Sequence, residues 1–218
     1  MSLAIFDLDN TLIGGDSDYL WGEFLCDEGL ISDRHAFEKM NEYFYNQYEL
    51  GLLDIYAWAE FSFKILTQYS IKELEVLRHN FMLQKIEPIL LDKAQDCINN
   101  HKENGDTVLV ITASNTFVTS PIVQRYGIEN LLATRPEIKS GRYTGKVSGI
   151  PCFQSGKIDN LMPWMAKNSE TLEGSSFYSD SHNDLPLLEL VDHPVAINAD
   201  KILTSEAKKK GWLNLDWR

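Results

Sequence analysis

Short apolar runs that alternate with amphipathic segments constrain the fold of this chain more than any other feature. From Glu87 onward, strand-like runs at 107–111, 131–134, 175–179 and 194–198 are separated by segments with helical spacing. A continuous apolar run of this length is typical of a strand covered on both faces. Strands that alternate with helices predict a parallel, doubly wound sheet, and such sheets bind ligands at the carboxyl ends of their strands.

A long segment of different character separates the first strand from the others. Residues 3–6 read Leu-Ala-Ile-Phe, and a polar loop follows as far as Gly15. From 16 to 84 aromatic residues are frequent and apolar residues recur every three or four positions, which predicts packed amphipathic helices. We therefore expect an α/β protein in which residues 1–15 and 85–218 form a Rossmann-like core and residues 16–84 form an inserted all-helical cap.

Helices are expected between the later strands and after them. Pro88 suits the first residue of a helix and Gly105 suits its end. Further helices are predicted at 116–126, 156–167, 184–191 and 202–210, and a small hairpin is predicted at 138–148.

The charge of the chain excludes some classes of partner. Its 218 residues include 32 acidic and 20 basic side chains, which gives a formal net charge of −12. A field of this sign repels nucleic acid and anionic membranes, so neither is an expected partner. It repels phosphate esters as well, so a site for a phosphorylated metabolite needs a metal ion and a lysine to reverse the local field.

The cysteines and the hydropathy pattern favour the cytoplasm. Cys26, Cys97 and Cys152 are widely spaced and form no metal-binding pattern, which indicates free thiols in a reducing compartment. The first residues lack a signal-peptide pattern, and no run of about 18 apolar residues occurs. We expect a cytoplasmic protein, either a monomer or a homodimer.

The first chemical motif directly follows the first strand. It reads Asp7-Leu8-Asp9-Asn10-Thr11. Carboxylates at i and i+2 of an extended segment point the same way and repel each other unless a cation lies between them or one stays protonated. The motif therefore indicates a metal site, or a nucleophile beside an acid/base. A polar loop that caps a helix is the alternative.

Three more polar motifs follow predicted strands or lie close to them. Thr112-Ala113-Ser114-Asn115 offers hydroxyl and backbone N–H groups for phosphate oxygens, although a plain helix cap has the same composition. Lys157 would neutralise phosphate charge, or lie on the surface. Asp180-Ser181-His182-Asn183-Asp184 supplies two carboxylates that suit Mg²⁺, or forms a capped turn. The order of the four motifs favours one joint site.

The joint pattern resembles the haloacid dehalogenase superfamily of phosphatases. Asp7/Asp9/Thr11, Thr112, Lys157 and Asp180/Asp184 carry the resemblance, which covers nearly the whole chain. The inserted helical segment is similar to the helical cap of that superfamily. The stretch 180–186 is similar to the phosphoserine-phosphatase-like branch, which includes some histidinol-phosphate phosphatases.

The resemblance implies a Mg²⁺-dependent phosphomonoesterase. Asp7 would attack phosphorus and become an aspartyl-phosphate, and Asp9 would act as acid and then as base. The resemblance implies that Mg²⁺ is held by Asp7, the backbone carbonyl of Asp9 and Asp180, with Asp184 in support. Thr112 and Lys157 would stabilise the transferring phosphoryl oxygens.

The substrate is expected to be a small phosphorylated metabolite from amino-acid metabolism. The resemblance places Asp16 where the family binds a substrate amine, and a gapless alignment on Gly51 places Glu60 where phosphoserine phosphatases have an arginine. This favours an amino-alcohol phosphate such as histidinol phosphate over phosphoserine. Further substrate contacts are assigned to Ser114, Asn115 and Asn183.

Three alternatives stay open at this point. A signalling receiver domain combines similar residues, but it has no place for an insertion of roughly 70 residues, judged from helical periodicity. A phosphate-binding module that has lost its chemistry would lack catalytic residue types that are present here. A phosphotransferase that uses the same intermediate differs only in its acceptor.

Overall fold

The computed structural model describes residues 2–218, and its centre is a six-stranded sheet in the order β3-β2-β1-β6-β7-β8. Each pairing within this sheet is parallel. The predicted doubly wound parallel sheet is therefore confirmed. The strands are β1 Leu3–Phe6, β2 Thr107–Asn115, β3 Asn130–Thr134, β6 Ser176–Ser179, β7 His193–Ile197 and β8 Leu213–Leu215.

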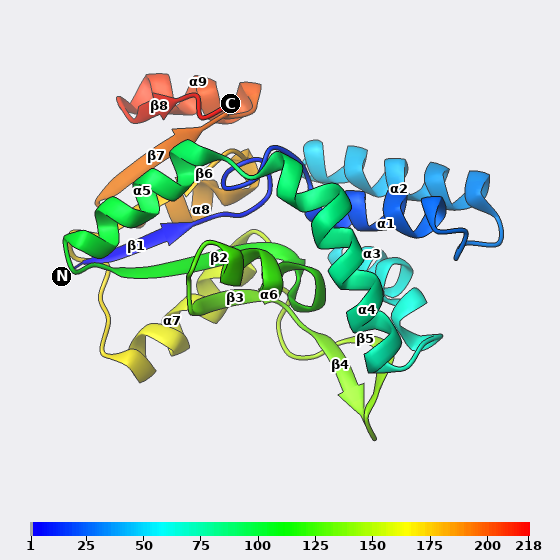
Figure 1. The fold of residues 1–218 in the computed structure, drawn as a ribbon. Coiled ribbons are helices and arrows are strands. Elements are labelled where there is room, and N and C mark those ends of the chain that lie inside the picture. Colours follow the sequence, from blue (N-terminus) through cyan, green and yellow to red (C-terminus); the bar gives the residue numbers. More distant parts are fainter. Residues whose placement is uncertain (1) are drawn as a thin grey trace.

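Helices cover both faces of the sheet (Figure 1). They are α5 Asp92–Glu103 and α6 Thr116–Arg125 on one face, and α7 Ser155–Asn168, α8 Leu185–Leu188 and α9 Lys201–Lys210 on the other. β1 shows why both faces need cover: Ala4 and Phe6 belong to one apolar cluster, and Leu3 and Ile5 belong to the other. Alternate side chains of a strand point to opposite faces, so an all-apolar strand is stable only between two layers.

The segment between β1 and α5 is helical, as its periodicity predicts. It contains α1 Ser17–Asp27, α2 Arg34–Glu49, α3 Ile55–Phe63 and α4 Ile71–Phe81. We call the segment from α1 to α4, with its connecting loops, the helical insertion. Figure 1 shows them beside the end of the sheet toward which the arrow of β1 points. The division of the chain into a core and a cap at 16 and 84 stays a prediction.

An aromatic cluster fixes one side of the helical insertion to the core. The ring of Trp21 in α1 packs against Phe81 of α4 and Phe117 of α6, with centroids 5.2 and 5.6 Å apart. Pro121 lies inside α6 and has no N–H to offer the carbonyl of Phe117, four residues earlier. The guanidinium of Arg78 in α4 donates to that carbonyl instead, at 2.8 Å. α6 therefore tolerates its proline because α4 supplies the missing donor.

Most predicted elements are present, with shifted ends. The hairpin is formed by β4 Pro136–Lys139 and β5 Arg142–Val147. The helix expected to open at Pro88 begins at Asp92 instead, because Glu87–Ile89 forms a separate 3₁₀ turn. The helix expected at 184–191 is shorter and follows a 3₁₀ turn at His182–Asp184. β8 was not expected, since its three residues are all exposed.

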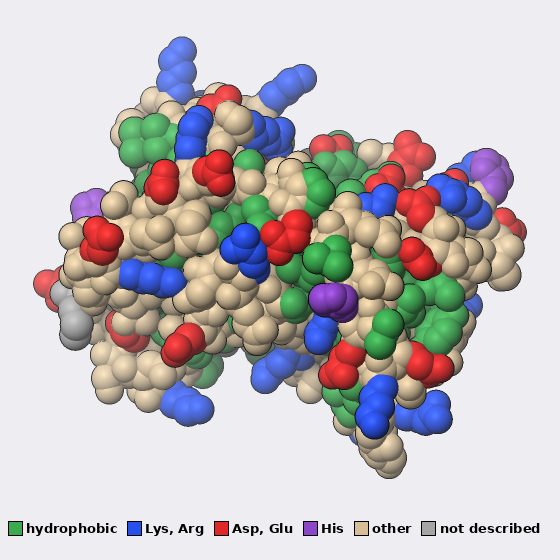
Figure 2. Space-filling view, viewed as in Figure 1, with side chains coloured by type: hydrophobic (Ala, Val, Ile, Leu, Met, Phe, Trp, Pro, Cys, Tyr) green, Lys and Arg blue, Asp and Glu red, His purple; other side chains and the backbone are tan. Residues whose placement is uncertain are grey.

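Charged side chains of both signs are interspersed over the face drawn in Figure 2, and basic side chains gather over α9. Within residues 2–218, every helix is too short or too polar to cross a membrane.

The first turn of α7 leaves no room for a side chain at Gly156. A Cβ built there would lie 2.1 Å from the backbone oxygen of Pro151, so the backbone itself would have to move. We expect Gly156→Ala to lower the free energy of unfolding by about 3 kcal/mol, the upper range for overpacking.

Gly14→Ala is the matched control in urea denaturation. A Cβ at Gly14 would meet Ile89 at no less than 3.6 Å, an ordinary contact, so we expect a change below about 1 kcal/mol. Equal losses in the two variants would contradict the argument from the tight turn.

Candidate active site

The polar motifs meet where the strand order of the sheet reverses, between β1 and β6. Phe6 pairs with Tyr178, and the amide of Asp7 donates to the carbonyl of Tyr178 at 2.9 Å. Asp7 therefore leaves the end of β1 beside the loop that carries Asp180 and Asp184. Ligands of doubly wound sheets bind at such switch points.

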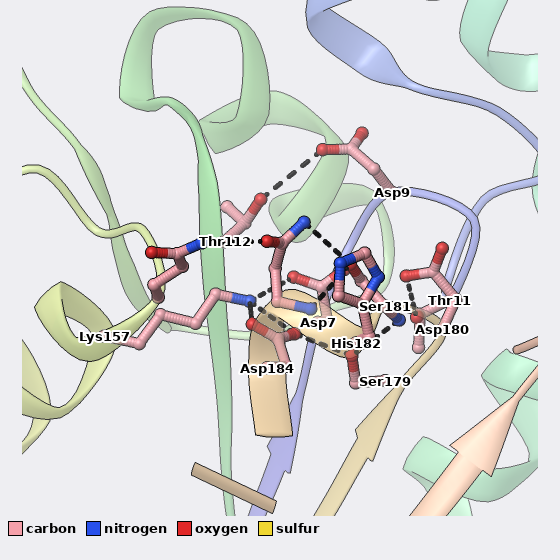
Figure 3. Close-up of polar contacts among 12 residues, drawn as sticks. Asp7, Asp9, Thr11, Thr112, Lys157, Ser179, Asp180, Ser181, His182 and Asp184 are labelled. Carbon is pink, nitrogen blue, oxygen red and sulfur yellow. Dashed lines mark hydrogen bonds and ion pairs between the residues drawn. The ribbon is translucent and has the colours of Figure 1, made fainter. Parts of the chain in front are cut away.

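Lys157 of α7 lies between two of these carboxylates (Figure 3). Its Nζ is 2.7 Å from Oδ1 of Asp7 and 2.7 Å from the carboxylate of Asp184. The lysine is only 2% exposed, and the hydroxyl of Ser179 also donates to Asp184, at 2.6 Å. A charge buried this deeply needs ion pairs and hydrogen bonds, and Lys157 has both.

Burial and charge act in opposite directions on this group. Burial raises the pKa of Asp7, Lys157 offsets part of the rise, and the result is a pKa of about 7. Burial alone would lower the pKa of Lys157, but Asp184 and Asp7 outweigh it, so the lysine is held in its charged form. The site therefore combines a lysine that stays charged with an aspartate whose anionic form is disfavoured by burial and is stabilised by a nearby cation.

Asp9 is directed toward β2 and the start of α1. Its carboxylate accepts from the backbone N–H of Ser17 and the hydroxyl of Ser114, both at 2.6 Å, and from the hydroxyl of Thr112 at 3.4 Å. Burial and the charge of Asp16 raise its pKa to about 6, although these hydrogen bonds oppose the rise. A carboxyl group with a pKa in this range is suited to give and take a proton near neutral pH.

The oxygen donors at this edge fit a hard divalent cation. Burial and the charges of Asp7 and Asp184 raise the pKa of Asp180 well above its usual range, and Thr11 donates to Asp180 at 3.3 Å. Among the contacts described above, only the ammonium of Lys157 offsets the negative charge of these carboxylates. Within residues 2–218 no three His, Cys, Asp or Glu side chains converge as a complete metal-binding group. Carboxylate oxygens are ligands that Mg²⁺ takes in small number, and it completes its shell with water and phosphate oxygens.

A small cavity of about 50 Å³ opens from Asp7 toward the helical insertion. Five aromatic side chains from α1, α2 and α3 form much of its wall: Tyr19, Phe44, Tyr45, Tyr48 and Trp58. Asp7, Asp9, Thr112 and Ser114 line its core side. None of the described residues that line the cavity is a lysine or an arginine.

Two further carboxylates line the cavity. Asp16 caps α1 by accepting from the N–H of Tyr19 at 2.8 Å. Asp18 accepts from the backbone and the side-chain amide of Asn115, at 3.0 and 2.6 Å. Burial, then Asp16 and Asp9, raise the pKa of Asp18 well above its usual range. The side wall of the cavity is therefore lined by carboxyl groups whose charged form is disfavoured by burial unless a cation lies beside them.

Three of the predicted substrate contacts, Asn115, Asn183 and Glu60, lie outside the lining of the cavity. Asn115 is buried, caps α6 and fixes Asp18, so it does not line the cavity. Asn183 contacts the helical insertion, through the carbonyl of Tyr48 at 2.9 Å.

The prediction for Glu60 is not supported by its position. Its side chain is exposed and lines a separate hollow with Lys64 and Thr144. Ile55 and Trp58, three residues apart in α3, face the cavity instead. A residue two positions beyond Trp58 lies on the opposite side of the helix, because successive residues turn by 100°.

The aromatic wall is the part of the site that sequence reasoning missed. Phe44, Tyr45 and Tyr48 share one face of α2 at a spacing of one, three and four residues. This spacing can be read from the sequence, but aromatic residues that only pack against a neighbouring helix show the same spacing. No sequence pattern marked Asp18 or Ser179 as part of the site.

Comparisons with known proteins agree with this geometry. The family described as haloacid dehalogenase-like hydrolase matches residues 4–189. The chain is 44% identical to the histidinol-phosphatase of Neisseria meningitidis serogroup C (strain 8013), across 100% of this chain and 99% of that protein.

Solved structures show the same fold. The chain resembles a protein of unknown function from Bordetella pertussis Tohama I with a TM-score of 0.93 and 39% identity, covering 100% and 99% of the two chains. It also resembles a phosphoserine phosphatase solved as a phospho-aspartyl intermediate analogue, with a TM-score of 0.72 and 19% identity, covering 100% and 93%.

Removal of the buried lysine should destabilise the protein strongly. Lys157→Met leaves Asp7 and Asp184 buried without their cation, and breaking a buried pair in this way costs about 3–5 kcal/mol. The free energy of unfolding, measured at pH 7 without divalent ions, should fall by that amount.

Lys167→Met, at the exposed end of the same helix, is the control and should change stability by less than about 1 kcal/mol. A similar small change for Lys157→Met would show that the ion pair is not the support described above.

Proposed function

The chain belongs to the haloacid dehalogenase-like hydrolase family and is a phosphatase, and from this premise we propose that it hydrolyses histidinol phosphate through an aspartyl-phosphate on Asp7. The observation that carries the substrate is the cavity, which joins an acidic wall to an aromatic one and has no basic side chain among its described lining residues.

The position of Asp7 supports its role as the nucleophile. Its carboxylate lines the cavity, and Lys157 holds Oδ1 from one side, which leaves Oδ2 to approach phosphorus. Bound Mg²⁺ would supply the positive charge that draws the phosphate and the nucleophile together, with Asp7, the carbonyl of Asp9 and Asp180 as its protein ligands and Asp184 in support. Asp7 would form the P–O bond while the bond to the leaving oxygen breaks.

Asp9 supports the proton transfers on either side of this intermediate. Protonated, it would give its proton to the leaving alkoxide, and as a carboxylate it would then take a proton from the attacking water. Its hydrogen bonds to Ser114 and the N–H of Ser17 hold the carboxylate in one orientation. Thr112 and Lys157 would donate to the phosphoryl oxygens, where charge collects in the transition state.

The chemistry of histidinol phosphate matches the cavity. It carries an ammonium group and an imidazole ring and has no carboxylate. Asp16 and Asp18 suit the cationic group, and the rings of Tyr45 and Trp58 suit a flat heterocycle or a cation over their faces. Phosphoserine carries a carboxylate that this acidic wall would repel. We also propose that residues 16–84 act as the cap over the site, and that the three free thiols suit a reducing cytoplasm.

Two aspartate substitutions test the proposed roles. Asp7→Asn should abolish release of phosphate, because the amide cannot act as the nucleophile. Asp9→Asn should lower kcat by about 10²–10⁴, the usual contribution of a positioned acid/base. Phosphate release from histidinol phosphate with Mg²⁺ is the measurement.

Asp96→Asn, an exposed aspartate on α5, is the control and should keep the activity of the unchanged protein. Substantial turnover by Asp7→Asn would refute the proposed nucleophile.

The acidic wall should set the substrate preference. We expect kcat/KM for histidinol phosphate to exceed that for phosphoserine by at least about tenfold. Asp16→Asn should lower kcat/KM for histidinol phosphate by about 10–100-fold, because a charge-assisted contact is lost, while asparagine still caps α1.

Asp33→Asn makes the same change at the cap of α2, away from the cavity, and should leave both substrates unaffected. Faster turnover of phosphoserine than of histidinol phosphate would exclude the proposed substrate.

A further inference from the structure

The backbone of Gln154 has a conformation that a residue with a side chain rarely adopts. Its φ and ψ are 48° and −123°, which match the first central position of a type II′ turn. Glycine is the usual residue there because a Cβ makes positive φ unfavourable. A glutamine held in this strained conformation points to a function for its side chain.

The side chain of Gln154 reaches from the core to the helical insertion. Its Nε2 donates to the backbone oxygen of Gly51 at 3.3 Å and to Oδ1 of Asn183 at 3.0 Å. The amide nitrogen of Asn183 in turn donates to the carbonyl of Tyr48 at 2.9 Å. Two side-chain amides of the core thus hold two backbone carbonyls at the end of α2, one in its last turn and one just beyond it.

Packing around these bonds is close. A Cβ at Gly51 would lie 3.0 Å from Nε2 of His182, so the chain of the insertion approaches the core where only glycine fits easily. The rings of Tyr48 and Phe153 lie 5.9 Å apart, next to the same hydrogen bonds. Tyr48 and Leu53, on either side of Gly51, both line the cavity. This contact therefore closes the wall of the substrate cavity.

Gln154 is also connected to the ion pair. Its carbonyl accepts from the backbone N–H of Lys157 at 3.1 Å, in the first turn of α7. The same residue thus holds the insertion with its side chain and begins the turn that carries the buried lysine. The opposite side of the insertion is anchored separately by Trp21, Phe81 and Phe117.

We propose that Gln154 is a positioning residue that fastens residues 48–51 of the helical insertion over the active site, so that the cavity is preformed before substrate binds. The fastening follows from the contacts alone. Its effect on turnover rests on the proposed phosphatase reaction at Asp7.

Two variants of Gln154 separate the side-chain bonds from the backbone conformation. Gln154→Ala removes the bonds and keeps a Cβ, and Gln154→Gly removes the bonds and suits the turn. Ser155→Ala, at the exposed neighbouring position, is the matched control.

Hydrogen exchange measured by mass spectrometry reports the fastening without any substrate. The amides of Leu50, Gly51 and Leu52 bond to carbonyls of α2, so their exchange reports opening of this segment. We expect these amides to exchange about tenfold faster in both Gln154 variants, with the sheet unchanged and Ser155→Ala like the unchanged protein.

Kinetics then test the role in the reaction. Because only the closed fraction binds substrate, KM should rise by the factor by which that fraction falls, up to about tenfold where the open form predominates in the variant, while saturating substrate closes the segment and keeps kcat within about twofold. Histidinol phosphate is the substrate, or p-nitrophenyl phosphate if histidinol phosphate is not hydrolysed, so failure of the proposed substrate is distinguished from failure of the fastening.

Three results would overturn the proposal. Unchanged exchange at 50–52 in both variants would show that the bonds do not hold the segment. Faster exchange throughout the sheet would show a purely structural role. A fall in kcat with unchanged KM would show that Gln154 acts only on the chemistry through Lys157.

Discussion

The buried ammonium of Lys157 between Asp7 and Asp184 is the interaction on which the rest of the structure depends. It joins three segments that are distant in the sequence: the end of β1, the first turn of α7 and the loop after β6. A buried lysine is stable only with such partners, so these segments must meet for the chain to fold. The tight turn at Gly156 and the unusual backbone of Gln154 both serve the placement of this lysine.

The sheet and the helical insertion contribute different kinds of side chain to the site. The ends of the parallel strands present the groups suited to phosphoryl transfer, Asp7, Asp9 and Thr112, and the insertion presents rings and carboxylates to the remainder of a substrate. This division explains how a chain with net charge −12 can accept a phosphate ester. In the proposed mechanism the positive charge is concentrated at the ion pair and the Mg²⁺ site, and the proposed role of the surrounding carboxylates is to select a substrate whose other end is cationic.

The sequence predicted the sheet and the meeting of Asp7, Lys157 and Asp184 correctly, because parallel strands that share a sheet bring their carboxyl ends together. It did not predict which faces of the inserted helices line the cavity. Those faces depend on how the inserted helices pack on one another, which an alignment without gaps does not contain, and Glu60 of α3 lines a separate hollow. Pro88 was assigned to a helix because a proline suits the first turn, but it lies in a 3₁₀ turn before α5.

The most direct test of the proposed chemistry is to trap the acyl phosphate. Borohydride reduces an aspartyl-phosphate to homoserine and leaves free carboxylates unchanged. The protein is treated during turnover of histidinol phosphate with Mg²⁺, and the peptide that contains residues 3–15 is sequenced by mass spectrometry. The account predicts homoserine at position 7 only in the presence of substrate. Homoserine at Asp9 or another aspartate, or none at any position during measured turnover, would contradict it.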